Sequence, residues 1–202
     1  GVWKYYILDP REPEKLKKHY SEYLYEILEK NETTGTLFFP EINIPEAPAK
    51  GNNRILIHPG SGSKRKNWPF EKFAALSEKL IPTVTFILGP AEIENSYYDK
   101  ISGIQEIVTP ASIKELYSLL YEGIFYIGCD SGVSHCAALA GVKSLVMFGP
   151  TNPEVWKPLG YQTEILKAPD FNLANLTVEQ CIEKIPSDFL LEKFGLRLQV
   201  KK

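Results

Sequence analysis

The stretch "GIFYIGCDSGVSHCAALAGVKSLVMFG", residues 123–149, decides the fold class. Two apolar runs, 123–129 and 143–149, flank a segment of small residues that is about one helix long. Continuous rather than alternating apolar residues are typical of strands that are buried on both faces of a parallel sheet. The stretch therefore predicts a strand, a crossover helix and a second, parallel strand.

The same alternation extends through most of the chain. Further apolar runs predict strands, and the stretches between them have the length and pattern of crossover helices. We therefore predict an α/β fold, with a parallel sheet covered by helices on both faces. The additional strands are expected at 54–60, 83–89 and 104–109, and the additional helices at 69–80, 92–101 and 112–122.

Composition narrows the classes of function. The 202 residues carry a formal net charge of −2, so no overall field favours nucleic acid or an anionic membrane. No apolar run reaches the roughly 18–20 residues of a transmembrane segment. The three cysteines lack CxxC spacing, which favours buried thiols in a reducing, cytoplasmic compartment over a disulfide framework or a metal site.

The first 53 residues differ from the rest. Residues 12–30 have a helical stripe of apolar side chains, and 31–53 are rich in Pro, Gly and Asn. We expect a helix followed by an extended linker, with one short strand at 36–39. The main domain is then expected to span residues 54–202.

Polar, glycine-bearing segments follow the predicted strands. The carboxyl ends of parallel strands meet at one edge of a sheet, and ligands bind there, where the strand order reverses. A ligand site is therefore expected at that edge, built from 60–66, 89–92, 109–112, 130–135 and 149–152.

The segment "GSGSKRK" (60–66) has features that suit a phosphate or diphosphate. Its glycines free backbone N–H groups, Ser61 and Ser63 supply hydroxyls, and Lys66 is one of three adjacent cations. The segment does not fit the Walker P-loop pattern. A solvated basic turn is the alternative interpretation.

Asp130 is expected to be the N-cap of a helix that begins at Ser131. The free N–H groups of residues 131–133 and the side chain of His135, one turn on, then line a pocket for a phosphorylated or sugar ligand. Because Asp130 and a phosphate would repel each other at one helix end, we assign Asp130 to sugar hydroxyls and Lys66, the amides and His135 to phosphates. The alternative is an ordinary capped helix with a satisfied histidine.

A serine hydrolase is not favoured. The nucleophile elbow requires GxSxG, whereas residues 128–132 place the serine one position late. Ser131 and His135 would also share one helix without a separate acid to orient the histidine.

Three segments carry a family resemblance: "HPGSGSKRKNWPFEKFAALSEKL", "LGPAEIE" and "IGCDSGVSHCAALAGVKSLVMFGPTNPEVWKPLG". Over about residues 50–165 the chain resembles the C-terminal half of the ADP-heptose:lipopolysaccharide heptosyltransferases, glycosyltransferase family 9. The resemblance implies a GT-B fold, in which two Rossmann-like domains enclose the active site. The C-terminal domain binds the nucleotide sugar, and the N-terminal domain binds the acceptor and supplies the catalytic carboxylate.

The resemblance also implies roles for individual residues. It assigns Lys66 to the donor phosphates, Glu92 to the adenosine ribose and a backbone group of Ala111 to the base. It places Asp130 at the donor sugar and Thr151 on the same edge. The other residues that it assigns to the donor phosphates are Ser61, Ser63, Ser131, Gly132 and His135.

The resemblance implies a domain organisation as well. Residues 1–53 correspond to the hinge helix and linker from a preceding domain, and 54–202 to a Rossmann-like nucleotide-sugar-binding domain. An acceptor domain, with the aspartate that acts as general base, has no counterpart in this chain, and the isolated chain is expected to be inactive.

The function expected from the resemblance is an inverting transfer of heptose from ADP-heptose to the lipopolysaccharide inner core. It would need neither metal nor cofactor, and the protein would be cytoplasmic, peripheral at the inner membrane. Two alternatives remain open: another GT-B nucleotide-sugar enzyme, such as a 2-epimerase, or a non-catalytic nucleotide-binding module.

Overall fold

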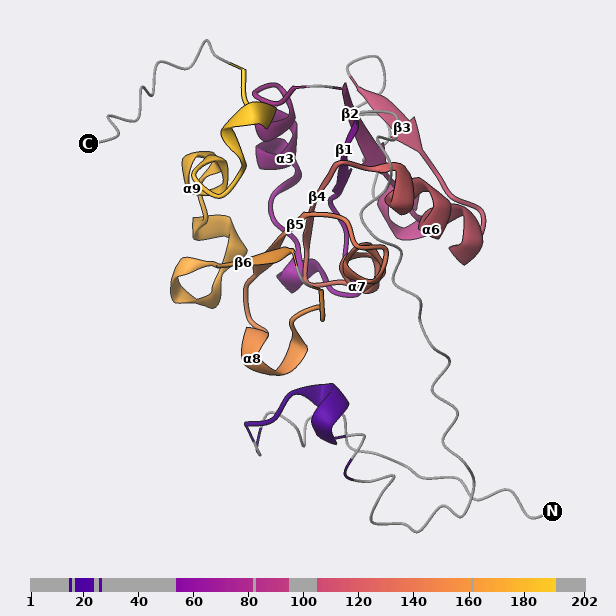
Figure 1. The fold of residues 1–202 in the computed structure, drawn as a ribbon. Coiled ribbons are helices and arrows are strands. Elements are labelled where there is room, and N and C mark those ends of the chain that lie inside the picture. Colours follow the sequence, from indigo (N-terminus) through magenta and orange to yellow (C-terminus); the bar gives the residue numbers. More distant parts are fainter. Residues whose placement is uncertain are drawn as a thin grey trace, which may run out of the picture.

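A six-stranded parallel sheet is the centre of the structure (Figure 1). The computed structural model describes residues 15, 17–23, 26, 54–81, 83–94, 105–160 and 162–191. The strands are β1 (Arg54–His58), β2 (Thr83–Ile87), β3 (Glu106–Val108), β4 (Phe125–Cys129), β5 (Ser144–Phe148) and β6 (Thr163–Lys167).

The strand order, β3-β2-β1-β4-β5-β6, reverses direction at the centre of the sheet. β1 and β4 are neighbours there, paired from Ile55 opposite Phe125 to His58 opposite Gly128. The loops that follow β1 and β4 therefore diverge from adjacent strand ends. This is the topological switch point at which α/β sheets bind ligands.

Helices cover both faces of the sheet, as predicted. α3 and α9 pack on one face, and α6 and α7 pack on the other (Figure 1). The α-helices named here are α3 (Phe70–Ser77), α4 (Pro90–Glu94), α6 (Ile113–Glu122), α7 (Gly132–Leu139), α8 (Pro153–Trp156) and α9 (Val178–Ile182). Short 3-10 turns are η1 (Lys64–Lys66), η2 (Pro169–Phe171), η3 (Leu173–Asn175) and η4 (Ser187–Phe189).

Successive side chains of β1 point to opposite faces and fill two separate cores. Ile55 and Ile57 belong to the core with α3 and α9, whereas Leu56 belongs to the core with α6 and α7. All three are fully buried. This double burial is the reason why the strand is continuously apolar, and it confirms the Rossmann-like α/β prediction.

The prediction that Asp130 caps the crossover helix is wrong. The N-cap of α7 is Ser131, whose hydroxyl accepts a hydrogen bond from the Ser134 N–H at 3.4 Å. The Asp130 N–H donates to the Met147 carbonyl at 3.0 Å, so Asp130 still belongs to the pairing of β4 with β5. The helix therefore begins one residue later than predicted, and the Asp130 side chain is free for other contacts.

The five predicted strands are all present, but β6 was not predicted. Its sequence, TEILK, contains only two apolar residues, and at the sheet edge three of its residues are partly buried and two are exposed. The helix predicted at 92–101 begins earlier, at Pro90, and its part beyond 94 lies outside the described residues. The linker at 31–53 and its strand at 36–39 also lie outside them.

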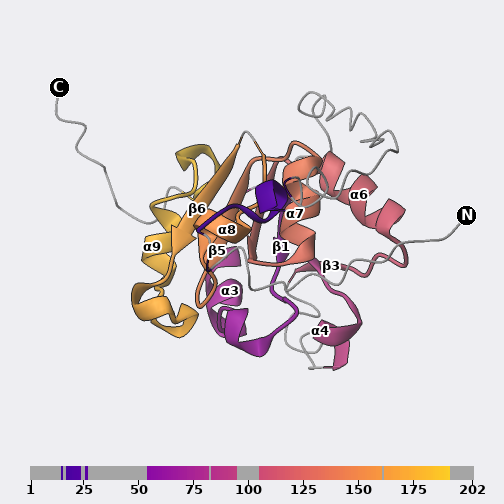
Figure 2. The same cartoon turned by 90° about the horizontal axis from the view of Figure 1, so that it is seen from below.

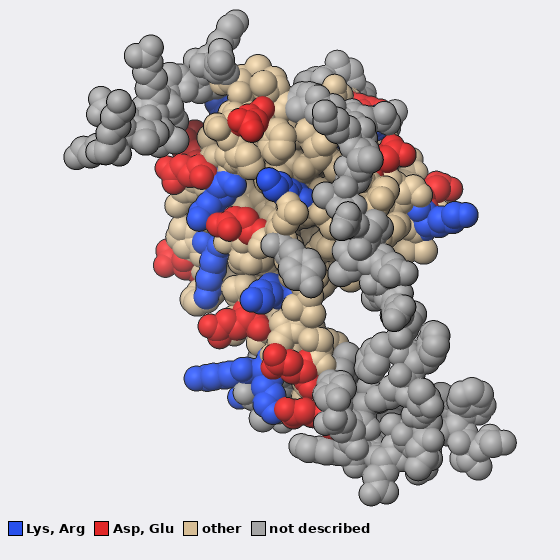
Figure 3. Space-filling model, in the orientation of Figure 1, with Lys and Arg blue, Asp and Glu red and all other residues tan. Residues whose placement is uncertain are grey.

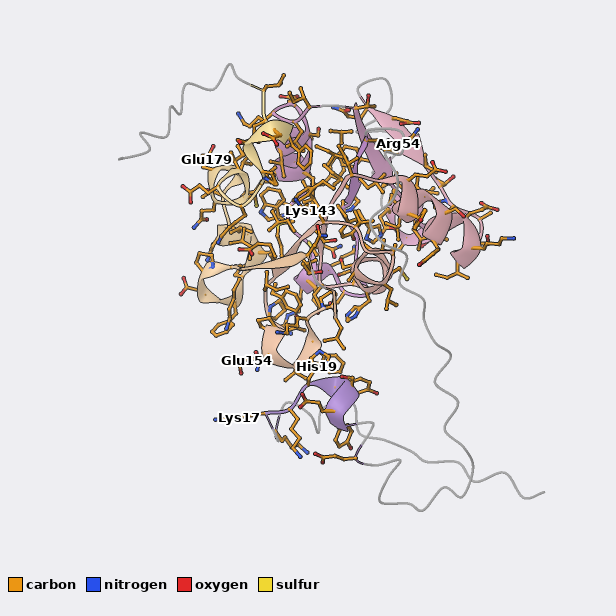
Figure 4. The ribbon with its side chains drawn as sticks, viewed as in Figure 1. Lys17, His19, Arg54, Lys143, Glu154 and Glu179 are labelled. Carbon is orange, nitrogen blue, oxygen red and sulfur yellow. The ribbon has the colours of Figure 1, made fainter. Side chains whose placement is uncertain are left out.

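The stripe predicted as a helix over 12–30 is described only in part. Residues 20–23 are helical, whereas 17–19 are not. This short helix lies against α8, near the carboxyl ends of the strands (Figures 1 and 2). The Tyr20 ring stacks on Trp156 with centroids 4.8 Å apart. His19, labelled in Figure 4, has its Nε2 atom 3.1 Å from the Lys157 carbonyl oxygen.

The surface carries charges of both signs. Basic and acidic side chains alternate over the face shown in Figure 3, in keeping with a net charge of −2. Within the described ranges, no helix combines the length and hydrophobicity needed to cross a membrane.

Candidate functional site

Three loops meet around the Asp130 carboxylate at the carboxyl edge of the sheet. Lys66 Nζ, from the loop after β1, lies 3.0 Å from Asp130 Oδ2. The Thr151 hydroxyl, from the loop after β5, donates to the same oxygen at 2.7 Å. Asp130 is buried, and the Lys66 side chain is only 24% exposed. The predicted segments 60–66, 130–135 and 149–152 thus come together.

A cavity of about 350 Å³ lies beside this cluster, between the loops after β1, β2 and β4. Its size falls within the usual range of small-molecule sites, roughly 300–1,000 Å³. One part of its wall is polar, and another part, from α6 and α7, is apolar. The lining residues are His58, Ser61, Gly62, Glu92, Ile113, Leu116, Ser131, Gly132, Val133 and Cys136.

Glu92 occupies a niche that only glycine leaves open. A Cβ atom at Gly60 would lie 1.7 Å from Glu92 Oε1, so the carboxylate fills the space of the missing side chain. Glu92 Oε2 accepts the Gly89 N–H at 2.8 Å and lies 3.8 Å from His58 Nε2. The predicted segment 89–92 therefore joins the site as well.

The Glu92 carboxyl is held in its charged form. Burial by itself raises the pKa of this carboxyl, but the neighbouring His58 ring and the N–H groups of Gly89 and Glu92 outweigh burial. The pKa of Glu92 is consequently below its ordinary value. A charged acceptor thus lines the cavity.

The two predicted serines of the first loop differ in position. Ser61 lines the cavity, and its hydroxyl lies 2.5 Å from Asn67 Oδ1 and 2.9 Å from the Ser63 carbonyl oxygen. Ser63 is exposed, precedes η1 and does not line the cavity. Ser61 therefore makes hydrogen bonds within the loop, whereas the Ser63 side chain faces solvent.

His135 lies on the side of the Asp130 cluster that faces α8, and it does not line the cavity. Burial lowers the pKa of His135, and nearby His19 and Lys66 lower it further. Asp130 and a hydrogen bond with the Trp156 backbone act in the opposite direction but do not reverse the shift. The neutral form of the His135 imidazole is therefore favoured at neutral pH.

Ala111 is exposed and lies outside the cavity lining. Its N–H donates to the Glu115 carboxylate at 2.9 Å. The contact with a base that the resemblance implies would therefore fall to the Ala111 carbonyl oxygen. Within the segment 109–112, the structure thus provides no side chain to the cavity, whose nearby apolar wall begins at Ile113.

Hydroxyl groups that the sequence did not single out support the turn between β4 and α7. The Ser134 hydroxyl donates to the Cys129 carbonyl at 2.6 Å and lies 3.0 Å from the Tyr126 hydroxyl, which therefore donates to it. A Cβ at Gly128 would lie 2.3 Å from the Tyr126 oxygen, so a glycine is needed there. The glycine in "YIGCDS" was the only sequence signal for this network.

The sequence did not point to His58 either, because it belongs to a buried strand. In the described ranges, no group of three or more His, Cys, Asp or Glu side chains could hold a metal ion. The metal-independence expected for the reaction stays a prediction.

A parallel sheet with this strand order, and a charged cluster and cavity at its switch point, defines a Rossmann-like α/β ligand-binding domain. The sequence matches glycosyltransferase family 9 (heptosyltransferase) over residues 12–185. The chain therefore belongs to that family.

Individual relatives agree with this membership. Lipopolysaccharide heptosyltransferase 1 of Escherichia coli (strain K12) is 28% identical over 82 residues, which are 41% of this chain and 26% of that protein. The solved structure of E. coli heptosyltransferase WaaC with ADP matches 68% of this chain and 45% of its own, with a TM-score of 0.59 and 23% identity. E. coli ADP-heptose lps heptosyltransferase II matches 67% and 46%, with a TM-score of 0.57 and 18% identity.

At these identities, the likeness to the solved structures establishes the fold. The matches cover about a quarter of the curated relative and less than half of either solved chain.

Proposed function

We propose that this chain is the donor-binding part of a heptosyltransferase and binds ADP-heptose or a similar nucleotide sugar. Family membership supports the proposal, as do the WaaC structures, one with ADP and another with ADP-2-deoxy-2-fluoro heptose. The observation that carries it is the Lys66–Asp130–Thr151 cluster beside the cavity at the switch point.

The residues around Asp130 bind two different parts of the nucleotide sugar, the diphosphate and the sugar. Lys66 and the amides at the start of α7 bind the diphosphate, since cations and helix N-termini both favour anions. A diphosphate draws Lys66 away from Asp130, whose carboxylate keeps the Thr151 hydroxyl and accepts hydrogen bonds from the sugar. Like charge keeps Asp130 itself off the phosphates.

The cavity takes the nucleoside. Glu92, charged and fixed in the Gly60 niche, accepts hydrogen bonds from the two ribose hydroxyls. Ile113 and Leu116 offer an apolar wall for a planar base. The Ala111 carbonyl oxygen contacts the base edge.

In the reaction, an acceptor hydroxyl attacks the anomeric carbon of the heptose with inversion and displaces ADP. A carboxylate of the preceding domain removes the hydroxyl proton. Lys66, the α7 amides and His135 stabilise the negative charge that develops on the leaving diphosphate, in place of a metal ion. A neutral His135 serves here as a hydrogen-bond donor.

The acceptor is the lipopolysaccharide inner core, bound by the preceding domain. This assigns the whole enzyme to the cytoplasmic side of the inner membrane, with peripheral attachment. Residues 1–53 then form the hinge and linker between the two domains, and 54–202 form the donor domain.

Calorimetric titration of the chain with ADP, ADP-heptose and UDP tests the proposal. ADP and ADP-heptose are expected to bind more tightly than UDP. Lys66→Ala is expected to weaken both ADP ligands, whereas Asp130→Ala weakens ADP-heptose more than ADP. A preference for UDP would favour another nucleotide-sugar enzyme. Binding of none of them by a folded chain would contradict the proposal.

A further inference from the structure

His58 is a polar residue at the end of an otherwise apolar buried strand. It is only 5% exposed, and its Nδ1 has no hydrogen-bond partner within the described part of the chain. Its other ring nitrogen, Nε2, lies 3.8 Å from Glu92 Oε2, and the ring lines the cavity. A buried polar atom without a partner destabilises a fold, so an apolar residue would pack here at lower cost.

The charge of Glu92 explains what the ring does. The Glu92 side chain is only 8% exposed, and burial by itself favours the neutral acid. Two backbone N–H groups and His58 are the groups that favour the carboxylate, and His58 is the only side chain among them. His58 and the Gly89 N–H approach the same oxygen, Glu92 Oε2, from two separate segments, β1 and the β2–α4 turn.

We propose that His58 is a positioning residue for Glu92, which keeps the carboxylate charged and seated in the Gly60 niche so that it can accept the ribose hydroxyls of the donor. The inference rests on the proposed function for its ligand, a nucleoside diphosphate. The interaction between His58 and Glu92 itself does not depend on which ligand binds. His58 itself does not touch the reacting atoms.

Two amide variants separate this role from simple space filling. In His58→Gln, the side-chain nitrogen can reach the place of Nε2 and keep an N–H group beside the Glu92 carboxylate. In His58→Asn, the shorter side chain reproduces only the place of Nδ1. Both variants have a neutral, polar side chain no larger than that of histidine, so they form a matched pair.

The first measurement is calorimetric titration of the 202-residue chain with ADP and with 2′,3′-dideoxy-ADP, which lacks both hydroxyls. His58→Asn is expected to weaken ADP about tenfold and to leave dideoxy-ADP nearly unchanged. His58→Gln is expected to retain most of the affinity for ADP. Equal losses for the two nucleotides, or no loss in His58→Asn, would overturn the proposal.

The second measurement needs no nucleotide. The urea midpoint is compared for wild type, His58→Asn, Glu92→Gln and the double variant. We expect His58→Asn to shift the midpoint less when Glu92→Gln is present, because the two side chains interact. Additive shifts would show that His58 does not act on Glu92, and would overturn the proposal.

The two measurements also separate this inference from the proposed function. If wild type binds ADP but His58→Asn binds it equally well, the positioning role is wrong and the donor site stands. If wild type binds no ADP while the midpoints remain non-additive, the donor site is wrong, and the role of His58 toward ribose is wrong with it.

Discussion

Substitution of Gly60 by alanine gives the sharpest test of the site geometry. The new Cβ would lie 1.7 Å from Oε1 and 2.4 Å from Cδ of Glu92, so the carboxylate has to leave its niche. The backbone of Gly60 lies outside the left-handed region, so alanine itself causes no strain in the main chain. The cost therefore measures the displacement of Glu92.

Its magnitude follows from the contacts that are lost. A hydrogen bond to a charged group, here from the Gly89 N–H, contributes about 1.5–3 kcal/mol. Replacing glycine by alanine regains about 0.4–1 kcal/mol, because the unfolded chain becomes less flexible. We expect a net loss of about 1–2 kcal/mol, which corresponds to a decrease of about 0.5–1 M in the urea midpoint.

Gly62→Ala is the matched control, because a Cβ at Gly62 meets no atom within 4 Å. It should leave the free energy of unfolding nearly unchanged. Gly60→Ala should also be harmless in a Glu92→Ala background, where no carboxylate competes for the niche. Equal behaviour of Gly60→Ala and Gly62→Ala would refute the geometry of the niche.

Three further predictions concern the same edge of the sheet. Lys66→Ala should weaken ADP about tenfold to a hundredfold through loss of a charged hydrogen bond, whereas Lys64→Ala, an equal change in charge at an exposed neighbour, should have little effect in calorimetry. Tyr126→Phe should lower the free energy of unfolding by about 1 kcal/mol, because it removes the buried hydrogen bond to Ser134. The lowered pKa of Glu92 should stabilise the fold above pH 4.5, and this contribution should disappear as the pH falls below 4.5 through the lower native pKa. Urea unfolding at several pH values should show this loss in wild type and not in Glu92→Gln.

Each of these predictions has an outcome that contradicts it. Equal losses of ADP affinity in the two lysine variants would reduce the role of Lys66 to general charge. An unchanged stability in Tyr126→Phe would mean that the hydroxyl network does not support the β4–α7 turn. Parallel pH profiles for wild type and Glu92→Gln would show that ionisation of Glu92 does not contribute to the stability of the fold.

The local sequence determined the sheet and its helices. β1, β2, β4 and β5 are short apolar runs between amphipathic stretches, and each lies within one predicted segment. β6 escaped prediction because an edge strand is only partly buried and needs few apolar residues. It becomes a strand because β5 offers it an unpaired edge, which no local pattern reveals.

The site residues could be selected from the sequence, but their contacts could not. Residue types and their positions after strands were enough to select Lys66, Glu92 and Asp130, because parallel strands end at one edge. The partners of these residues were not predictable. Lys66 meets Asp130 across 64 positions of sequence, and Glu92 meets His58 across the switch from β1 to the loop after β2.

The N-cap of α7 shows the limit of local rules. Both Asp130 and Ser131 are good caps, and the sequence gives no ground for choosing between them. Pairing with β5 decides between them, because the Met147 carbonyl accepts a hydrogen bond from the Asp130 N–H and extends the strand pairing by one residue. Sequence alone determined which elements form and at which edge the polar residues gather. Only the tertiary structure decided which of those residues pair, because pairing depends on backbone register and on space, such as the niche at Gly60, that distant segments create.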